Sequence, residues 1–237
     1  MKQSHSAQKL LQSIRDTNAL WQLFQPEDKL LIGISGGKDS LALLDCLAQL
    51  GLPNLHSVHI RIEPDAPVPF ADFCRERSVF TILDSDILLE VKSAKRHNIC
   101  YMCSRRKRKL IAEYAVAQGF ATIVLAHHLD DMLETFLLNL FFQRELSTML
   151  PNQELFGGKL RIIRPFYQTA EKDIIRYAKT NQLPVSAWQC GYETHSRRHW
   201  LKQQIRLWQQ AHPKLNLKDN LFQAITHINP DFLPIKK

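Results

Sequence analysis

The six residues Ser35–Ser40, with the sequence Ser-Gly-Gly-Lys-Asp-Ser, constrain the fold more than any other feature of the chain. They follow an apolar run at 30–34 that predicts a buried strand, and they precede an apolar-periodic run that predicts a helix. A strand, a turn of small residues and a helix N-terminus together form an anion site, because glycines admit a phosphate close to the backbone N–H groups. The alternative is an ordinary glycine-rich turn between a strand and a helix.

This loop differs from a Walker A loop. That pattern requires Gly-x-x-x-x-Gly-Lys followed by Ser or Thr, whereas here Ile32 occupies the first glycine position and Asp39 follows Lys38. Ser35 and Ser40 add hydroxyl donors for a phosphate. An acidic residue beside a phosphate cradle indicates a magnesium ion between the two, so we expect Asp39 to contact Mg²⁺.

The order of the predicted elements favours an α/β fold with a doubly wound, mainly parallel sheet, because strands alternate with helices. We expect strands at 29–34, 55–62, 78–83 and 122–126, helices at 39–50, 69–77, 104–118, 129–142, 170–180, 196–210 and 216–227, and a hairpin at 154–164. The 237 residues, 45% of them apolar, suffice for one domain. It would comprise an N-terminal helix at 6–24, a core at 29–187 and a C-terminal helical segment at 196–227.

A second polar stretch, His-His-Leu-Asp-Asp at 127–131, follows the predicted strand 122–126. Ligands of such sheets bind beyond the carboxyl ends of the strands, so this stretch and the loop at 35–40 belong to one edge. His127 and Asp131 can then reach a ligand or magnesium ion held by the loop, with Glu134 supporting them. The alternative is an acidic helix start, which the helix dipole favours by itself.

The chain has five cysteines, and an odd number argues against a disulfide framework. Cys46 and Cys74 lie in helical, apolar surroundings and are expected in the core. Cys100 and Cys103 form a C-x-x-C pattern that can bind a metal or act as a redox pair. Together with Cys190 they can hold a [4Fe–4S] cluster; a zinc site completed by a histidine, and chance placement of Cys190, remain alternatives.

Positive charge is concentrated in two places. The formal net charge of +8 favours a polyanionic partner, although many basic proteins bind no nucleic acid. The predicted RNA-binding residues are Arg105, Arg106, Arg108, Lys109, Arg197 and Arg198. Five cations at 105–109, at a helix N-terminus, oppose the helix dipole, so a compensating partner is expected; the alternative is a solvated helix face. We expect Lys107 to face back towards the cysteines and the active site.

The Ser-Gly-Gly-x-Asp-Ser loop resembles that of the PP-loop ATP pyrophosphatases, which cleave ATP between the α and β phosphates and adenylate an oxygen of their substrate. Further motifs follow in order: the C-x-x-C, then His-x-x-Asp-Asp-x-x-Glu-Thr at 127–135, Arg164-Pro165-Phe166 with Glu171-Lys172-Asp173-Ile174, and Cys190-Gly191. This order is similar to the tRNA 2-thiocytidine synthetases, the TtcA family, over residues 8 to about 205. The family's second C-x-x-C is incomplete, because Ala187 stands at its first position.

The resemblance implies an adenine nucleotide alpha-hydrolase-like fold and ATP-dependent thiolation of tRNA, most simply 2-thiocytidine formation at position 32 of the anticodon loop. It implies ATP, Mg²⁺ and a [4Fe–4S] cluster as cofactors, and tRNA, a sulfur donor such as a cysteine desulfurase and a second copy of the chain as partners. The implied ATP-binding residues are Ser35, Gly36, Gly37, Lys38, Asp39, Ser40 and His127; the catalytic ones are Asp39, Lys107 and Asp131; the cluster ligands are Cys100, Cys103 and Cys190.

No apolar run approaches the roughly 20 residues that span a bilayer, and the N-terminus does not resemble a signal peptide, so a cytoplasmic enzyme is expected. Two other classes of function stay open. One is a PP-loop amidoligase or other nucleotide-activating enzyme whose cysteines hold structural zinc. The other is a non-catalytic relative that binds RNA or nucleotides.

Overall fold

The computed structural model describes residues 4–63, 66–87, 99–187 and 197–233. The chain divides into two compact units, the first formed by Met1–Leu129 and Met149–Glu193, the second by Asp130–Thr148 and Thr194–Lys237. The organisation as a single domain stays a prediction. Among the described residues, no helix has the length and apolar character needed to cross a membrane.

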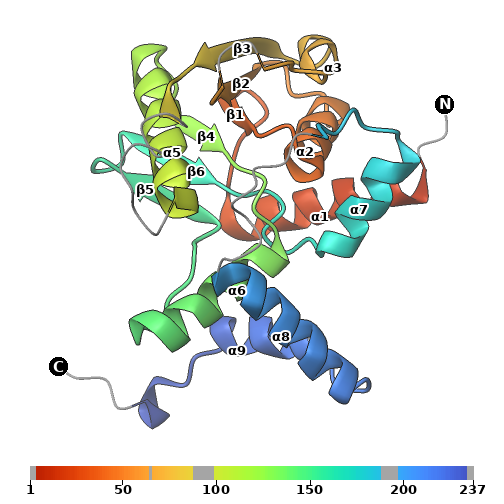
Figure 1. Cartoon of the computed structure of the whole chain (residues 1–237), viewed down its shortest axis with the longest axis vertical. Helices are drawn as coiled ribbons and strands as arrows, with labels where there is room; N and C mark the ends of the chain where they lie inside the picture. Colours follow the sequence, from red (N-terminus) through yellow and green to blue (C-terminus); the bar gives the residue numbers. More distant parts are fainter. Residues whose placement is uncertain (1–3, 64–65, 88–98, 188–196, 234–237) are drawn as a thin grey trace. The chain divides into compact units, whose positions relative to one another are not determined.

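A six-stranded sheet forms the centre of the first unit (Figure 1). Its strands are β1 Leu30–Ile34, β2 Leu55–Arg61, β3 Val79–Asp84, β4 Thr122–Val124, β5 Asn152–Leu155 and β6 Leu160–Ile163. They lie in the order β3-β2-β1-β4-β6-β5, and every pair is parallel except β5 with β6. The doubly wound, mainly parallel sheet is therefore confirmed. The order reverses between β1 and β4, which is where ligands of such sheets bind.

Helices cover both faces of this sheet (Figure 1). The helices of the first unit are α1 His5–Trp21, α2 Lys38–Gln49, α3 Ala71–Arg75, α5 Ile99–Ala117 and α7 Glu171–Thr180. Side chains of α1, α2 and α7 share one core with Leu30 and Ile32, whereas Leu31 belongs to a second core with residues of α5. This alternation follows from the strand geometry, because successive side chains point to opposite faces.

A buried polar network fastens α7 to α2. The Tyr177 hydroxyl donates to Asp45 at 2.6 Å, and Gln49 donates to that hydroxyl at 2.7 Å. Arg77, which follows α3, donates to the other oxygen of Asp45 at 2.6 Å. Burial, followed by the neighbouring Cys46 and Asp45, raises the pKa of Tyr177, so the hydroxyl keeps its hydrogen and the network stays intact. Helix α7 is thus held firmly against α2.

The boundaries of two elements differ from the prediction. Helix α5 begins at Ile99, five residues before the predicted start at 104, so Cys100 and Cys103 lie inside its first turns and not on the approach to it. The basic run at 105–109 therefore occupies the second and third turns, and the argument that it opposes the dipole of a helix N-terminus is wrong. Beyond Leu138, the predicted helix 129–142 changes to a π-helix, Asn139–Gln143.

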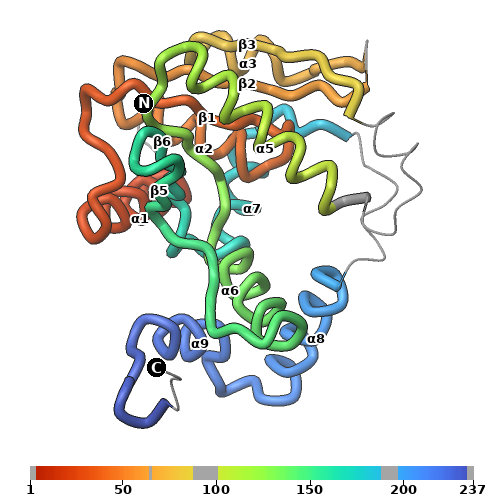
Figure 2. The backbone as a smooth tube through the Cα atoms, turned by 90° about the vertical axis from the view of Figure 1, so that its left-hand side faces the viewer, coloured from red at the N-terminus to blue at the C-terminus, as the bar shows by residue number. Residues whose placement is uncertain are grey.

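The second unit is helical. It contains α6 Leu129–Leu138 from its second residue onward, the π-helix, α8 Arg197–Ala211, α9 Leu217–Thr226 and a 3-10 turn at Pro230–Phe232. Leu137 of α6 packs with Leu201 and Ile205 of α8 in a small core, which Leu217 of α9 borders. Figure 2 shows these helices side by side. The predicted C-terminal helices at 196–210 and 216–227 are confirmed to within two residues.

Candidate active site

The loop after β1 is shaped by its own residues. Gly36 has a φ of +83°, a conformation that glycine adopts readily, and a Cβ atom there would lie 2.5 Å from the Phe70 ring. The Ser35 and Ser40 hydroxyls are 3.1 Å apart, and Ser40 Oγ donates to the carbonyl of Gly37 at 3.0 Å. Gly37 is the N-cap of α2, and no side chain of a described residue caps this helix. The two serines therefore stabilise the loop conformation, and the backbone N–H groups at the start of α2 are available to bind an anionic ligand.

Lys38 and Asp39 form an ion cluster with Glu171, which the sequence analysis did not assign to the site. The Lys38 ammonium lies 3.1 Å from Asp39 and 3.2 Å from Oε1 of Glu171, at the start of α7. Burial lowers the pKa of Lys38, but the carboxylates of Asp39 and Glu171 together outweigh burial and the pKa is raised. In the sequence, Glu171 belongs to the stretch Glu171-Lys172-Asp173-Ile174, which is part of the family's motif order but does not by itself indicate a partner for Lys38.

Asp39 retains an oxygen suited to a cation. Lys38 lies 3.1 Å from Oδ1 of Asp39, but it directs its hydrogen bond to Oδ2, and the buried Oδ1 accepts no hydrogen bond from the described residues. Nε2 of His128 is 3.8 Å from this same oxygen. Mg²⁺ prefers carboxylate oxygens together with phosphate oxygens, so Asp39 beside a phosphate-binding loop fits the predicted ion.

The two histidines after β4 have different environments. His128 is buried and faces Asp39, whereas His127 is half-buried and its Nδ1 accepts a hydrogen bond from Nε of Arg164 at 3.2 Å. The edge of the sheet thus brings His128, at the end of β4, close to Asp39 of the β1 loop, and ATP binding by His127 stays a prediction. The sequence offered only the His-His doublet and could not say which ring faces the loop.

Helix α5 brings Lys107 towards the carboxyl end of β2. His59, near the end of that strand, donates from Nδ1 at 2.8 Å to the Ile34 carbonyl, directly before the loop. Burial, assisted by the charges of Lys107 and Arg61, lowers the pKa of His59 although the Ile34 carbonyl opposes this. The charge of Lys107 thus acts on His59, while the predicted orientation of Lys107 and its catalytic role stay predictions.

The remaining basic residues of α5 are more exposed. Arg105, Arg108 and Lys109 are exposed, and Arg106 is half-buried. Lys109 pairs with Glu113 at 3.5 Å one helical turn away, which leaves it accessible to solvent. The exposed side chains fit either interpretation of the basic run, an RNA contact or a solvated face.

The predicted cluster ligands are only partly described. Cys100 and Cys103 are three residues apart in α5. Cys103 is half-buried. The side chain of Cys100 and all of Cys190 lie outside the described residues. Within the described part of the chain, no three potential His, Cys, Asp or Glu ligands gather around one point, and the cluster ligands stay a prediction.

The second unit contains its own acidic cluster, at the start of α6. Arg198 of α8 donates to Glu134 at 2.7 Å and lies 3.2 Å from Asp131, while Lys218 of α9 pairs with Asp130. Burial raises the pKa of Glu134, against the opposing charge of Arg198. The predicted catalytic residue Asp131 and the predicted RNA-binding residue Arg198 are thus ion-paired with each other, and both roles stay predictions.

Arg197, also predicted to bind RNA, stacks on an aromatic side chain of the second unit. Its guanidinium lies 4.7 Å from the centre of the Phe142 ring, which makes an edge contact with Trp200. Arg197 and Trp200 are exposed. This arrangement is compatible with stacking against RNA bases, but it is also an ordinary cation–π contact of a helix start.

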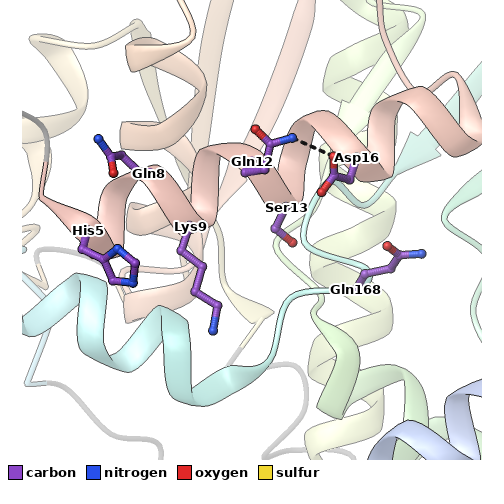
Figure 3. A pocket seen from close by; sticks show the side chains of 7 residues that line it. All are labelled: His5, Gln8, Lys9, Gln12, Ser13, Asp16 and Gln168. Carbon is purple, nitrogen blue, oxygen red and sulfur yellow. Dashed lines mark hydrogen bonds between the residues drawn. The ribbon is translucent and has the colours of Figure 1, made fainter.

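A shallow pocket of about 420 Å³ lies on the outer surface of α1 (Figure 3). It is lined by His5, Gln8, Lys9, Gln12, Ser13, Asp16 and Gln168. Gln12 donates to Asp16 at 2.8 Å within the pocket, and Lys9 pairs at 2.8 Å with Asp173 of α7, which does not line it. None of the predicted site residues borders it, and the sheet edge is the candidate active site.

A parallel sheet with a glycine-rich anion loop at its switch point defines a nucleotide-binding α/β protein of the PP-loop class. A family model described as the PP-loop domain matches residues 2–207. The tRNA-cytidine(32) 2-sulfurtransferase of Methylococcus capsulatus is 32% identical over 222 residues, covering 89% of this chain and 76% of that protein. That of Methylibium petroleiphilum is 33% identical over 233 residues, covering 94% and 72%.

Solved structures share the fold. The U34-tRNA thiolase NcsA from Methanococcus maripaludis, described with its [4Fe–4S] cluster, has a TM-score of 0.74 at 20% identity and covers 94% of this chain and 81% of its own. The chain belongs to the PP-loop domain family and, within it, to the family of tRNA-cytidine(32) 2-sulfurtransferases. The resemblance inferred from the motifs is confirmed.

Proposed function

We propose that this protein uses ATP to convert cytidine 32 of tRNA to 2-thiocytidine. The observation that carries the proposal is the edge between β1 and β4. At this edge, the glycine loop is held by the contact between the Ser35 and Ser40 hydroxyls and leads directly into the N-terminus of α2. The Oδ1 atom of Asp39, in the first turn of α2, accepts no hydrogen bond from any described residue. The names of the relatives supply the substrate, and this edge supplies a place for the nucleotide that activates it.

The first step activates the base. The backbone of Gly36 and Gly37 and the N-terminus of α2 hold the β and γ phosphates of ATP. The O2 atom of cytidine attacks the α-phosphorus, the bond from that phosphorus to the bridging oxygen breaks, and pyrophosphate leaves. Lys38, held by Asp39 and Glu171, stabilises the negative charge that moves onto the pyrophosphate. The protein accelerates this step by positioning and by charge stabilisation.

The second step exchanges oxygen for sulfur. A sulfur nucleophile attacks C2 of the adenylated base, the bond from C2 to O2 breaks, and AMP leaves with that oxygen. Lys107 and Asp131 are the proposed catalytic residues besides Asp39. A cysteine desulfurase is the proposed type of sulfur donor, the enzyme is proposed to work in the cytoplasm, and a homodimer is the proposed assembly.

Two inorganic groups belong to the proposal. Asp39 would hold Mg²⁺ together with phosphate oxygens, for which its Oδ1 is suited. Cys100, Cys103 and Cys190 would hold a [4Fe–4S] cluster, and the place of Cys103 in the early turns of α5, three residues after Cys100, is compatible with this role. Such a cluster, when bound through three cysteines, supplies an iron that can bind sulfur.

The basic side chains are proposed to bind the tRNA backbone. These residues are Arg105, Arg106, Arg108 and Lys109 of α5, and Arg197 and Arg198 of α8. Phosphate contacts of this kind position the RNA and do not read its sequence.

Nucleoside analysis of tRNA tests the proposal. Cells that lack the gene should lose 2-thiocytidine, and the wild-type protein should restore it. Asp39→Asn should not restore it, whereas the control Asp16→Asn should, because Asp16 is exposed on the outer face of α1 and, among the described residues, bonds only Gln12. Undiminished 2-thiocytidine in the deleted strain, or full restoration by Asp39→Asn, would contradict the proposed function.

A further inference from the structure

A buried arginine lies at the end of β6, beside the end of β4. Only 4% of Arg164 is exposed. Its Nε donates to Nδ1 of His127 at 3.2 Å, its Nη2 donates to Oε1 of Gln153 at 3.2 Å, and its Nη1 donates to the carbonyl of Leu150. No carboxylate of a described residue forms an ion pair with it. All three partners are neutral acceptors.

Such an arrangement is costly, because a buried charge without an opposite charge loses the hydration that water provided. Burial, with the charge of Arg108 adding to it, lowers the pKa of Arg164 to about 10, so the guanidinium still carries its proton at neutral pH. Because burying the charged guanidinium of Arg164 is unfavourable, we expect Arg164 to have a role that a neutral side chain could not perform.

The contact with His127 has a strict chemical consequence. A guanidinium has five N–H donors and no acceptor, so Nδ1 of His127 must be the acceptor in their hydrogen bond. A neutral imidazole carries one hydrogen, which then resides on Nε2. Protonation of Nδ1 would place two donors and two positive charges against each other. The ring is therefore held neutral, with Nε2–H as its only N–H donor.

We propose that Arg164 is a positioning residue that fixes His127 in the Nε2–H form, so that His127 donates a hydrogen bond to an oxygen of the bound substrate and does not act as a general base. The second half of this statement rests on the proposed function, but the tautomer does not. The acceptor is either a phosphate oxygen of ATP or the O2 atom of the cytidine, and the kinetic measurements below distinguish them.

Arg161, on the same strand, is the matched control. It lies towards the other end of β6 and donates to the hydroxyl of Thr122 at 3.0 Å and to Asp28 at 3.1 Å. It is half-buried and has a carboxylate partner. Its replacement removes an arginine of β6 without touching His127. Gln153→Ala is a second control, because it breaks one contact of Arg164 and leaves the contact with His127.

Nitrogen NMR of the histidine rings tests the tautomer directly. In the wild-type protein, the His127 signals, assigned by their loss in His127→Gln, should show a protonated Nε2 and an unprotonated Nδ1. In Arg164→Gln and Arg164→Lys they should move towards a mixture of both tautomers, and in Arg161→Gln and Gln153→Ala they should stay unchanged. A wild-type ring with its hydrogen on Nδ1 overturns the proposal, whatever the variants do and whether or not they fold.

Steady-state kinetics tests whether Arg164 affects catalysis by acting through His127. Arg164→Gln should lower kcat/KM about tenfold to a hundredfold, as does loss of a partner that orients a ligating histidine. Arg161→Gln should change it less than about threefold. A double variant, Arg164→Gln with His127→Gln, should be no slower than His127→Gln alone. Fully additive losses mean that Arg164 does not act through His127.

The same kinetic measurements show whether His127 donates to a phosphate oxygen of ATP or to the O2 atom of the cytidine. If His127 binds a phosphate of ATP, the KM for ATP rises in the Arg164 variants while the KM for tRNA is unchanged. If it binds O2 of the cytidine, kcat falls and the KM for ATP is unchanged. If the protein proves not to thiolate tRNA, the NMR result still decides whether Arg164 fixes the ring.

Discussion

The ammonium of Lys38 lies 3.2 Å from Oε1 of Glu171, a residue 133 positions further along the chain. This contact joins the loop after β1 to the first turn of α7. It also shares one lysine between two carboxylates, because Asp39 is 3.1 Å from the same ammonium. Glu171 therefore orients Lys38 and lowers the cost of holding it beside Asp39 before ATP arrives.

Replacing Glu171 should weaken ATP binding more than folding. Glu171→Gln should raise the KM for ATP about threefold to tenfold and lower the unfolding free energy by about 1 kcal/mol at most, since the pair is partly hydrated. The control is Asp173→Asn, in the same turn, which breaks the 2.8 Å pair with Lys9. It should lower stability by a similar amount and leave the KM for ATP unchanged. If Glu171→Gln and Asp173→Asn change the KM for ATP equally, Glu171 has no specific role in ATP binding.

The same ion cluster predicts a pH dependence. The pKa of Lys38 is raised above its ordinary value of 10.5, so the native state binds this proton more tightly than the unfolded chain does. The stabilisation is therefore complete below pH 10.5 and is lost as the pH rises through the raised value. Unfolding free energies of the wild type and Lys38→Met should differ by a constant amount at neutral pH and converge above pH 10.5.

Two glycines with similar backbones predict different sensitivities to alanine. Gly36 and Gly51 have φ angles of +83° and +76°, so each alanine costs roughly 1–2 kcal/mol of backbone strain. Only at Gly36 does the added Cβ meet the Phe70 ring at 2.5 Å, whereas at Gly51 no described residue offers an atom within 4 Å. Gly36→Ala should cost more stability in denaturant titrations and abolish ATP binding. Similar losses of stability in both variants would contradict the close approach at Gly36.

Much of this site could be predicted because its determinants are local. The strand, the loop at 35–40 and the helix after it follow one another directly, and the apolar period marks both elements. The pair of Lys38 with Glu171 could not be predicted, because it depends on how α7 packs against α2 through Tyr177 and Asp45. The sequence pattern does not show how α7 packs against α2.

The errors have equally specific causes. The prediction placed the start of α5 at 104, after the cysteines, and did not use the N-cap signal that Asn98 offers directly before Ile99. The proximity of His128 to Asp39 was not predicted, because the sequence does not show which ring of the His127-His128 doublet faces the loop after β1; ATP binding by His127 stays a prediction. Arg164 appeared only within a family motif, and its burial among neutral acceptors is a tertiary property.

The cysteines predict a pattern of iron content. Anaerobically isolated wild-type protein should contain about four irons per chain with sulfide. Cys100→Ala, Cys103→Ala and Cys190→Ala should each lose the iron. Cys46→Ala and Cys74→Ala should retain it, because these thiols are buried and burial raises the pKa of each to about 12. Stoichiometric zinc without sulfide would instead support a structural metal site.

The basic residues of α5 predict a salt-dependent affinity for tRNA. Changing Arg105, Arg108 and Lys109 to Gln should weaken binding and make the slope of log K against log salt shallower, by about 0.7–0.9 for each phosphate that is no longer neutralised. The matched control changes the exposed cations of α7, Lys172, Arg176 and Lys179, and removes the same charge. Equal changes of slope in both triple variants would show only an effect of net charge.

Sulfur transfer by the purified protein tests the central claim most directly. The enzyme, prepared anaerobically, is given ATP, magnesium, a sulfide source and tRNA transcripts with cytidine or uridine at position 32. Pyrophosphate and 2-thiocytidine are then measured together. We predict equal amounts of both products with the cytidine transcript, 2-thiocytidine at position 32 only, and neither product with Asp39→Asn. Pyrophosphate release without thiolation of the tRNA, or thiolation without ATP, would contradict the account.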